Sequence, residues 1–173
     1  MKIMIIGYSG SGKSTLAVFL GKQYRVPVLY LDTLHFLPNW VERSESEEHA
    51  LLADFLDKND GWVIDGNYSK NNYERRLEEA DLIILMLFNR FSCLRRAVKR
   101  SREFRNKVRP SIAEGCTEKM DFEFAMWILR GGRTKRQRER YAGIAKRYAD
   151  KCVTIHNQRE LDRYYAAFSN NLT

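Results

Sequence analysis

The chain has 173 residues and a formal net charge of +8 at pH 7, and 44% of its residues are hydrophobic and 12% aromatic. This length suits one domain with a substantial core, and the composition excludes an intrinsically disordered chain. No apolar stretch approaches the roughly 20 residues that a membrane-spanning helix needs, and the apolar run near the N-terminus is too short for a signal peptide. We therefore expect one cytoplasmic domain over residues 1–173, without membrane contact.

Short apolar runs alternate with longer helical patterns along the chain. Five runs predict strands, the last of them weaker than the rest: residues 3–6, 28–31, 62–64, 82–88 and 152–155. The runs are continuous rather than alternating in polarity, which is typical of strands with both faces covered. The pattern predicts an α/β fold with a five-stranded parallel sheet and helices on both faces.

Helical patterns lie between these runs and after the last one. We expect helices over residues 14–24, 44–56, 73–79, 91–104, 133–149 and 159–168. In the second of these, Leu51, Leu52, Phe55 and Leu56 are expected to face inward. Residues 107–121 contain Pro110 and Gly115 and few periodic apolar residues, which favours a loop or lid.

A glycine-rich motif follows the first predicted strand and opens the first predicted helix. Gly7-Tyr8-Ser9-Gly10-Ser11-Gly12-Lys13-Ser14-Thr15 matches the P-loop pattern G-x-x-x-x-G-K-[ST] in full. Consecutive backbone N–H groups and the positive end of the helix can surround phosphate oxygens there. Lys13 is expected to reach the β- and γ-phosphates of a nucleoside triphosphate, and the Ser14 hydroxyl to ligate Mg²⁺. We take the nucleotide to be ATP.

Two aspartates stand where predicted strands end. Asp32 follows the second strand and Asp65 the third. In an open parallel sheet both strand ends face the crevice beside the P-loop. Asp65 is expected near the waters of Mg²⁺, and Asp32 near an acceptor hydroxyl that it would orient or deprotonate. A turn or cap role remains the alternative for each.

The class of P-loop protein is narrowed by what the chain lacks. Residues 106–109 read Asn-Lys-Val-Arg, without the aspartate of the guanine-selecting N-K-x-D motif. ABC and AAA+ ATPases are larger and carry further motifs that this chain does not have. Small-molecule kinases remain as the favoured class.

The chain also resembles a known family. The segments that carry the resemblance are Leu31–Phe36, Pro38–Trp40, Trp62–Ser69, Ala80–Asp81, Cys93–Arg96, Arg109–Pro110, Gly115–Cys116 with Glu118, and Asp121–Phe124 before Trp127. These resemble the bacterial adenylate-kinase-like proteins known as DNA topology modulation proteins, over about residues 1–141. The resemblance implies an adenylate-kinase-like P-loop fold, nucleotide binding, an acceptor-side region at about 32–60 and a lid at about 105–132.

The acceptor side departs from adenylate kinases. Residues 65–69 read Asp-Gly-Asn-Tyr-Ser where those enzymes have Asp-Gly-Phe-Pro-Arg, which argues against ordinary AMP phosphorylation. The acceptor pocket is expected between the second and third strands, with a sugar, polyol or nucleoside favoured over a nucleotide. Our candidates for it are Asp32, His35, Trp40, Asn67, Tyr68 and Arg76. A packing role fits His35, Trp40 and also Trp62 better than catalysis or base stacking.

Basic residues gather in the second half of the chain. Residues 89–147 hold 18 Lys and Arg against 6 Asp and Glu, which suits either nucleic acid or two phosphorylated ligands. Arg96 and Arg100 are four apart on one helical face, and Arg133, Arg136 and Arg140 lie on a later helix. We expect Arg96, Arg100, Arg133 and Arg136 to act on the transferring phosphoryl group, and the later helix, with Arg140, to close the other side of the site. A solvated basic helix face is the alternative for each.

The sequence therefore favours an ATP- and Mg²⁺-dependent phosphotransferase with a small-molecule acceptor. A DNA-associated P-loop ATPase and a nucleotide-binding pseudoenzyme are the alternatives. The chain has no helix-turn-helix, OB-fold or zinc-finger pattern that would read a nucleic acid, so direct DNA binding is not favoured.

Overall fold

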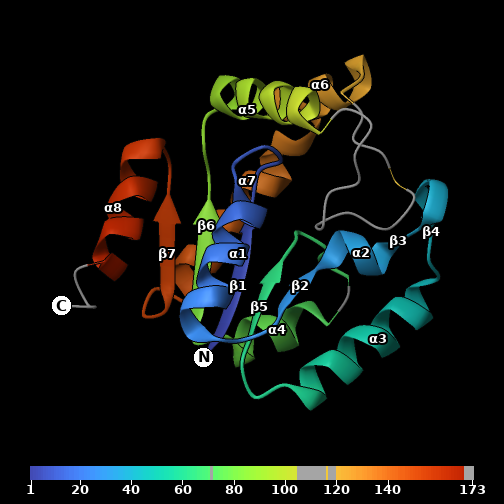
Figure 1. The fold of residues 1–173 in the computed structure, drawn as a ribbon, viewed down its shortest axis with the longest axis vertical. Coiled ribbons are helices and arrows are strands. Elements are labelled where there is room, and N and C mark those ends of the chain that lie inside the picture. The colour runs from blue at the N-terminus through green and yellow to red at the C-terminus, as the bar shows by residue number, and fades with distance from the viewer. Residues whose placement is uncertain (71, 105–115, 117–119, 170–173) are drawn as a thin grey trace.

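The fold is seen in a computed structural model that describes residues 1–70, 72–104, 116 and 120–169. Its main sheet has five parallel strands in the order β2-β5-β1-β6-β7 (Figure 1). The bounds of these strands are β1 Lys2–Gly7, β2 Val28–Tyr30, β5 Trp62–Asp65, β6 Leu82–Met86 and β7 Cys152–Ile155. The predicted five-stranded parallel sheet is thus confirmed.

The central strand explains why the apolar runs are continuous. In β1, Ile3 and Ile5 belong to the core on one face of the sheet, whereas Met4 and Ile6 belong to the core on the other. All four side chains are 0% exposed. A strand that is buried on both faces needs apolar side chains at every position.

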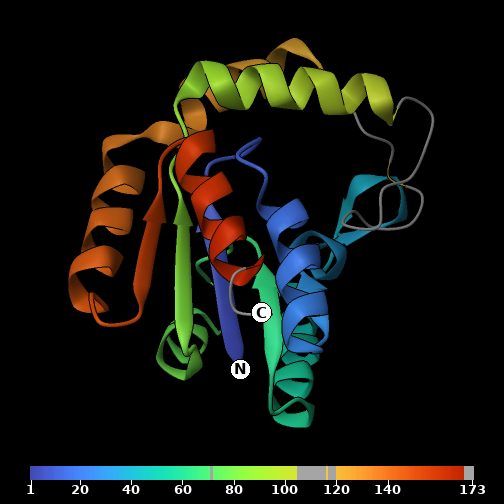
Figure 2. The ribbon, with the colours of Figure 1, turned by 60° about the vertical axis from the view of Figure 1, so that its left-hand side comes forward.

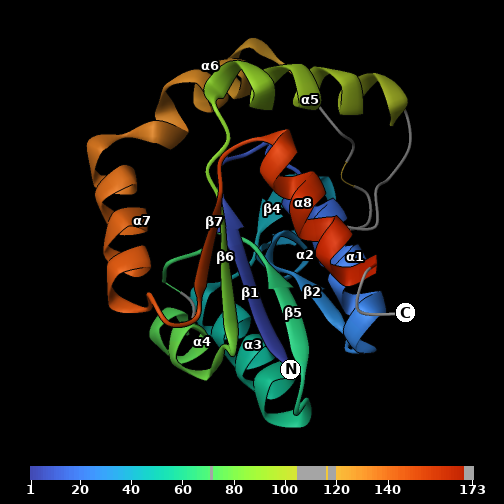
Figure 3. The same cartoon turned by 90° about the vertical axis from the view of Figure 1, so that its left-hand side faces the viewer.

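Helices cover both faces of the sheet (Figure 3). One face is covered by α1 (Lys13–Tyr24) and α8 (Gln158–Ser169), and the other by α3 (Glu45–Lys58), α4 (Tyr73–Glu79) and α7 (Lys135–Arg147). In α3, Leu52 and Leu56 are buried as expected, but Leu51 is 40% exposed. Leu51 is therefore a correction, because the buried stripe of α3 runs along the Leu52 and Leu56 side.

Two further helices cross above the carboxyl ends of the strands (Figure 2). They are α5 (Arg90–Glu103) and α6 (Phe122–Leu129), each capped by a side chain at its start, Asn89 and Asp121 respectively. The lid was expected over about 105–132, and residues 105–115 and 117–119 lie outside the described residues. The described part of that range holds α6, for which the sequence predicted no helix, and the short 3-10 turn Gly131–Arg133. Arg133 therefore lies before α7, and not on it as the expected helix over 133–149 had implied.

The segment after β2 is more structured than the sequence predicts. It forms the short helix α2 (Leu31–His35) and a hairpin of β3 (Phe36–Leu37) and β4 (Val41–Glu42), joined by the 3-10 turn Pro38–Trp40. Asn39 and Trp40 have φ angles of 63° and 62°. Left-handed backbone at two successive residues that are not glycine gives the turn its tight bend. This hairpin forms one wall of the site described below.

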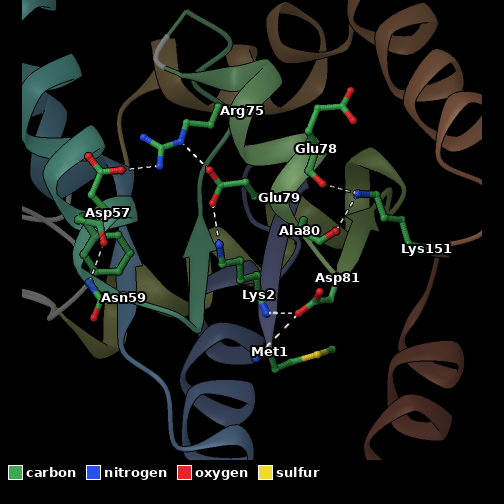
Figure 4. A network of polar contacts seen from close by, with 11 residues as sticks. Met1, Lys2, Asp57, Asn59, Arg75, Glu78, Glu79, Ala80, Asp81 and Lys151 are labelled. Atoms are coloured by element: carbon green, nitrogen blue, oxygen red, sulfur yellow. Dashed lines mark hydrogen bonds and ion pairs between the residues drawn. The ribbon is translucent and has the colours of Figure 1, made fainter.

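Ion pairs join the elements at the amino ends of the strands (Figure 4). Lys2 Nζ lies 2.7 Å from Glu79 Oε2, and Arg75 links Glu79 to Asp57 with two contacts of 2.6 Å. The network connects β1, α4 and α3 at the edge of the sheet away from the P-loop. No helix in the described part of the chain is long and apolar enough to span a membrane.

Candidate functional site

The P-loop runs from the end of β1 into α1 and bends tightly. Gly7, Gly10 and Gly12 all have positive φ angles, of 146°, 78° and 99°. A Cβ atom at Gly7 would lie 2.3 Å from the carbonyl oxygen of Met86, and one at Gly10 would lie 2.5 Å from that of Cys93. Both contacts are with backbone, so the loop keeps this shape only with glycine at these two positions.

Lys13 and Ser14 open helix α1 beside the end of β5. The Ser14 hydroxyl donates to Asp65 Oδ2 at 2.6 Å, and Lys13 Nζ donates to the carbonyl of Tyr8 at 3.0 Å. Burial lowers the pKa of Lys13, while the charges of Asp65 and Asp32 oppose this shift. The hydroxyl and carboxylate expected near Mg²⁺ are therefore adjacent, with a cation within reach of both aspartates.

Asn67 braces the P-loop. Its side-chain carbonyl accepts from the Gly7 N–H at 2.9 Å, and its amide donates back to the Gly7 carbonyl at 2.5 Å. The Tyr141 hydroxyl also donates to the Asn67 side chain, at 3.3 Å. Asn67 lines the cleft, as the acceptor assignment requires, but its amide is already engaged by backbone.

A cleft of about 1500 Å³ opens between the P-loop, the α2 and β3–β4 segment, and helices α6 and α7. Most ligand pockets are smaller, at roughly 300–1,000 Å³, so this cleft has room for a second ligand beside a nucleotide. Sequence-predicted residues that line it are Tyr8, Ser9, Gly10, Lys13, Ser14, Asp32, His35, Trp40, Asp65, Asn67, Tyr68, Arg100, Arg133 and Arg140.

Asp32 lies in the first turn of α2 and is held by Tyr68. The Tyr68 hydroxyl donates to Asp32 Oδ1 at 2.9 Å. Burial, followed by the charge of Asp32, raises the pKa of Tyr68. The phenol therefore stays protonated and continues to orient the carboxylate at the cleft wall.

His35 is packed as the sequence suggests, but its partner is a residue that sequence reasoning missed. Its Nδ1 lies 3.0 Å from Oε2 of Glu48 on α3, and its ring packs against those of Phe36 and Tyr68 at centroid distances of 4.6 Å. Glu48 is only 1% exposed and lines the cleft. The sequence holds a signal for this, since Glu48 is four and eight residues before the buried Leu52 and Leu56 and shares their helical face.

The two tryptophans behave differently from each other. Trp62 is 0% exposed and lies in the core, as expected. Trp40, also expected to pack in the core, is 38% exposed at the mouth of the cleft. The left-handed turn of the hairpin carries Trp40 outward, with its ring edge-on to Phe36 at 5.0 Å.

Arg76 is placed away from the cleft. It is 0% exposed, and its guanidinium donates to the backbone carbonyl of Tyr68. Burial lowers its pKa to about 10, against the opposing effects of Tyr73 and Glu48. Arg76 thus supports the chain after β5 rather than facing a ligand.

The predicted arginines divide into two groups. Arg100 and Arg133 line the cleft, together with Arg140. The Arg133 guanidinium lies 3.8 Å from the centre of the Tyr8 ring, which stacks this cation on the P-loop. Arg140 donates to the Asn67 carbonyl at 3.5 Å.

Arg96 and Arg136 fall outside this group. Arg96 donates to the Ser11 carbonyl at 2.9 Å, stacks on Phe88 at 4.5 Å and also contacts Gln158, so it braces the P-loop from the side of α8. Arg136 is exposed on α7, and it is absent from the described residues that line the cleft. The helical face that turns inward is the one that carries Arg140.

Among the described residues, no group of three or more His, Cys, Asp and Glu side chains could hold a metal ion by itself. A divalent ion here would need ligands from a bound nucleotide in addition to the protein. The pair formed by Ser14 and Asp65 fits that arrangement, in which Mg²⁺ keeps waters and binds substrate phosphates.

Comparisons with known proteins place the fold. No protein-family model matches the chain, and no curated protein matches it. Deoxyadenosine kinase from M. mycoides, whose structure holds dCMP and a flexible dCDP, is similar over 100% of both chains, with a TM-score of 0.53 and 14% identity. The protein TT1252 from Thermus thermophilus is similar over 100% of this chain and 98% of its own, with a TM-score of 0.57 and 18% identity.

An uncharacterised protein from Eubacterium ventriosum is also similar, over 90% of this chain and 89% of its own, with a TM-score of 0.50 and 17% identity. At these identities the likeness concerns the fold and not the reaction. The chain has the α/β fold of a P-loop kinase, a five-stranded parallel sheet flanked by helices.

Proposed function

We propose that the protein is a phosphotransferase that uses ATP with Mg²⁺ and transfers the γ-phosphoryl group to the hydroxyl of a small molecule. One observation carries the proposal: a single cleft is lined by Lys13 and Ser14 of the P-loop and by Asp32 across from them. Donor and acceptor could therefore meet in one place, and positioning is the main contribution of the protein to phosphoryl transfer.

The donor side is assigned to the P-loop and its neighbours. Backbone N–H groups of residues 9–15 would surround the β-phosphate, and Lys13 would lie against the β- and γ-phosphates. Ser14 would ligate Mg²⁺ directly and Asp65 would hold its waters. The ion, when bound, would neutralise charge that develops on the phosphate oxygens.

The acceptor side is assigned to Asp32. The acceptor oxygen would attack the γ-phosphorus as the bond to the bridging oxygen of ADP breaks, and the electron pair of that bond would leave with ADP. Asp32 would take the proton of the acceptor hydroxyl, with Tyr68 fixing the carboxylate through its 2.9 Å hydrogen bond. Arg133 and Arg140, which line the same cleft, would stabilise charge on the moving phosphoryl group.

The deciding experiment measures the formation of ADP and of phosphorylated acceptor in the presence of Mg²⁺ and ATP. The acceptors tested are nucleosides, nucleoside monophosphates, sugars, polyols and duplex DNA. Stimulation by one small molecule, with a phosphorylated product of matching mass, is the expected result. Stimulation by DNA alone would instead favour a DNA-associated ATPase. ATP binding without turnover on any member would favour a pseudoenzyme.

One structural feature favours the alternative function, a DNA-associated ATPase. The outer side of α5 exposes Phe91, which is 73% exposed, next to the exposed basic residues Arg90, Arg95 and Arg102. Aromatic and basic side chains together suit a nucleic-acid strand. If that surface binds DNA through phosphates alone, the affinity will fall steeply with salt, which a titration at two salt concentrations would measure.

A further inference from the structure

The part of the cleft lined by α2, the β3–β4 hairpin, α3 and Tyr68 is called the acceptor half below. One carboxylate there has an oxygen without a hydrogen-bond partner among the described residues. Glu48 is 1% exposed, and its Oε2 is bonded to His35. Its Oε1 is buried and has no hydrogen-bond partner among the described residues. Leaving a buried carboxylate oxygen without a donor is unfavourable, so a ligand that supplies a donor would gain affinity there.

Glu48 borders the cleft but is only 1% exposed, so contact with a ligand requires a small shift of the side chains around it. Helix α3 packs against α2, and Glu48 and Asp32 line the same cleft. The rings of His35 and Tyr68 are 4.6 Å apart between centroids, with Tyr68 bonded to Asp32 and His35 to Glu48. The other ring nitrogen of His35 lies 3.8 Å from Glu42. A molecule whose hydroxyl meets Asp32 could extend along these rings toward Glu48.

Aromatic rings at steep angles to one another line part of this half of the cleft. His35, Phe36 and Trp40 pack edge to face in series, with centroid distances of 4.6 and 5.0 Å. Tyr68 adds a fourth ring. Aromatic walls of this kind favour a flat ring system over a flexible sugar chain.

The charge of this half does not suit a phosphate. Asp32, Glu42, Glu45 and Glu48 all line it. Its basic residue Arg43 is paired with Glu47 and with the Leu34 carbonyl, and Lys70 is paired with Glu45. Arg76 adds a countercharge to Glu48 from within the core, where it is 0% exposed. Because Glu45 is already paired with Lys70, an acceptor phosphate here would meet Asp32, Glu42 and Glu48, while Arg100, Arg133 and Arg140 also line the cleft.

We propose that Glu48 is the specificity-determining residue of the acceptor site and that it accepts a hydrogen bond from the amine of a heterocyclic alcohol. The acceptor is then an unphosphorylated, nucleoside-like molecule, with its hydroxyl at Asp32 and its donor group at Glu48. This inference rests on the proposed function, because it assigns the acceptor of that same reaction.

The test measures binding to the full chain by calorimetry, without ATP, so that it does not depend on turnover. The probes are amine-bearing nucleosides, among them adenosine, deoxyadenosine and cytidine, together with their 5′-monophosphates. Purine riboside, which lacks the amine of adenosine, is the matched partner for adenosine. We expect at least one amine-bearing nucleoside to bind about 10- to 150-fold more tightly than its partner without the amine, the range for a hydrogen bond to a charged group.

Two variants separate recognition from folding. Glu48→Met removes both acceptors, and the preference for the amine should fall to within about threefold. Glu48→Gln keeps the shape and one neutral acceptor, so the preference should fall to about 2- to 13-fold, the range for a neutral hydrogen bond. Asp54→Asn, on the exposed side of the same helix, should keep it. Circular dichroism and thermal unfolding of all three variants identify any that fail to fold, and Glu48→Gln gives the result if Glu48→Met does not fold.

The outcomes are distinct. An unchanged preference in folded Glu48→Gln, tighter binding of the monophosphates, or no nucleoside binding would each overturn the assignment of Glu48. Failure of the proposed function would look different, since nucleoside binding would persist while no phosphorylated product formed with Mg²⁺ and ATP.

Discussion

Charged side chains have different partners at the two ends of the strands of the central sheet, called here the amino edge and the carboxyl edge. At the amino edge, Lys2, Arg75 and Glu79 form ion pairs of 2.6–2.7 Å (Figure 4). At the carboxyl edge, Lys13 and Arg133 bond to backbone carbonyls, a sulfur atom and a ring, and Asp65 and Asp32 act on Lys13 only through their charge. Cations at the amino edge are thus neutralised by the fold, whereas those at the carboxyl edge remain electrostatically suited to an anionic ligand.

This difference separates stability from function. Parallel sheets bind ligands beyond the carboxyl ends of their strands, and the P-loop, Asp32 and Asp65 all lie there. Changes at the carboxyl edge should therefore reduce turnover much more than stability. Changes at the amino edge should do the reverse.

The largest effect is expected for Lys13→Met. Loss of this cation from the phosphate cradle should lower turnover by about 100- to 1,000-fold, and should remove the rise in unfolding temperature that Mg²⁺ and ATP produce. The apo protein should stay folded, because burial disfavours the charge of Lys13. Steady-state kinetics and thermal unfolding measure both, with Lys22→Met, exposed on the same helix, as the control. Full activity in Lys13→Met would exclude the P-loop from the reaction.

Asp32→Asn should come next. Loss of the proton acceptor should reduce product formation by about 100-fold or more and leave ATP affinity unchanged. Tyr68→Phe, which removes only the hydrogen bond to Asp32, should give a smaller loss of about fivefold to tenfold. Separate measurements of ATP binding and of phosphoryl transfer distinguish these effects. Weaker ATP binding in Asp32→Asn would place this residue on the donor side.

Arg133 and Arg136 test whether position in the cleft decides the role of an arginine. Arg133→Met should lower turnover by about 10- to 100-fold, the range for a lost hydrogen bond to a charged group. Arg136→Met, on the exposed side of α7, should change it by less than about twofold. Equal losses in both variants would mean that Arg136 reaches the substrate in a conformation other than the one seen here.

The smallest effect is expected at the amino edge. Glu79→Gln should lower the free energy of unfolding by about 0.5–1 kcal/mol and leave turnover unchanged. Hydrogen bonds from Lys2 and Arg75 lower the pKa of Glu79, so the stabilisation is present above the ordinary carboxyl value of 4.5 and is lost as the pH falls through the lower folded-state value. Denaturant unfolding at pH 7 and pH 3 measures this. A difference that persists at pH 3 would point to packing instead of charge.

Much of the sheet and the P-loop could be predicted from local sequence. The P-loop motif and the apolar runs on either side of it located β1, α1 and the carboxyl edge of the sheet, because buried parallel strands need apolar residues throughout and a phosphate cradle needs glycine where φ is positive. Strand ends followed by aspartate placed Asp32 and Asp65 in one cleft. Each of these inferences depends on residues within a few positions of one another.

The remainder was decided by tertiary contacts. The sequence assigned Arg96, Arg133 and Arg136 the same role. In the structure, α5 crosses the strand ends and bonds Arg96 to the P-loop, the turn Gly131–Arg133 brings Arg133 to the cleft, and α7 leaves Arg136 exposed. No role was assigned to Glu48 from the sequence, yet packing of α3 against α2 buries it beside His35. Side-chain chemistry and spacing determine what a residue can bind, but which neighbours it meets depends on how distant elements pack together.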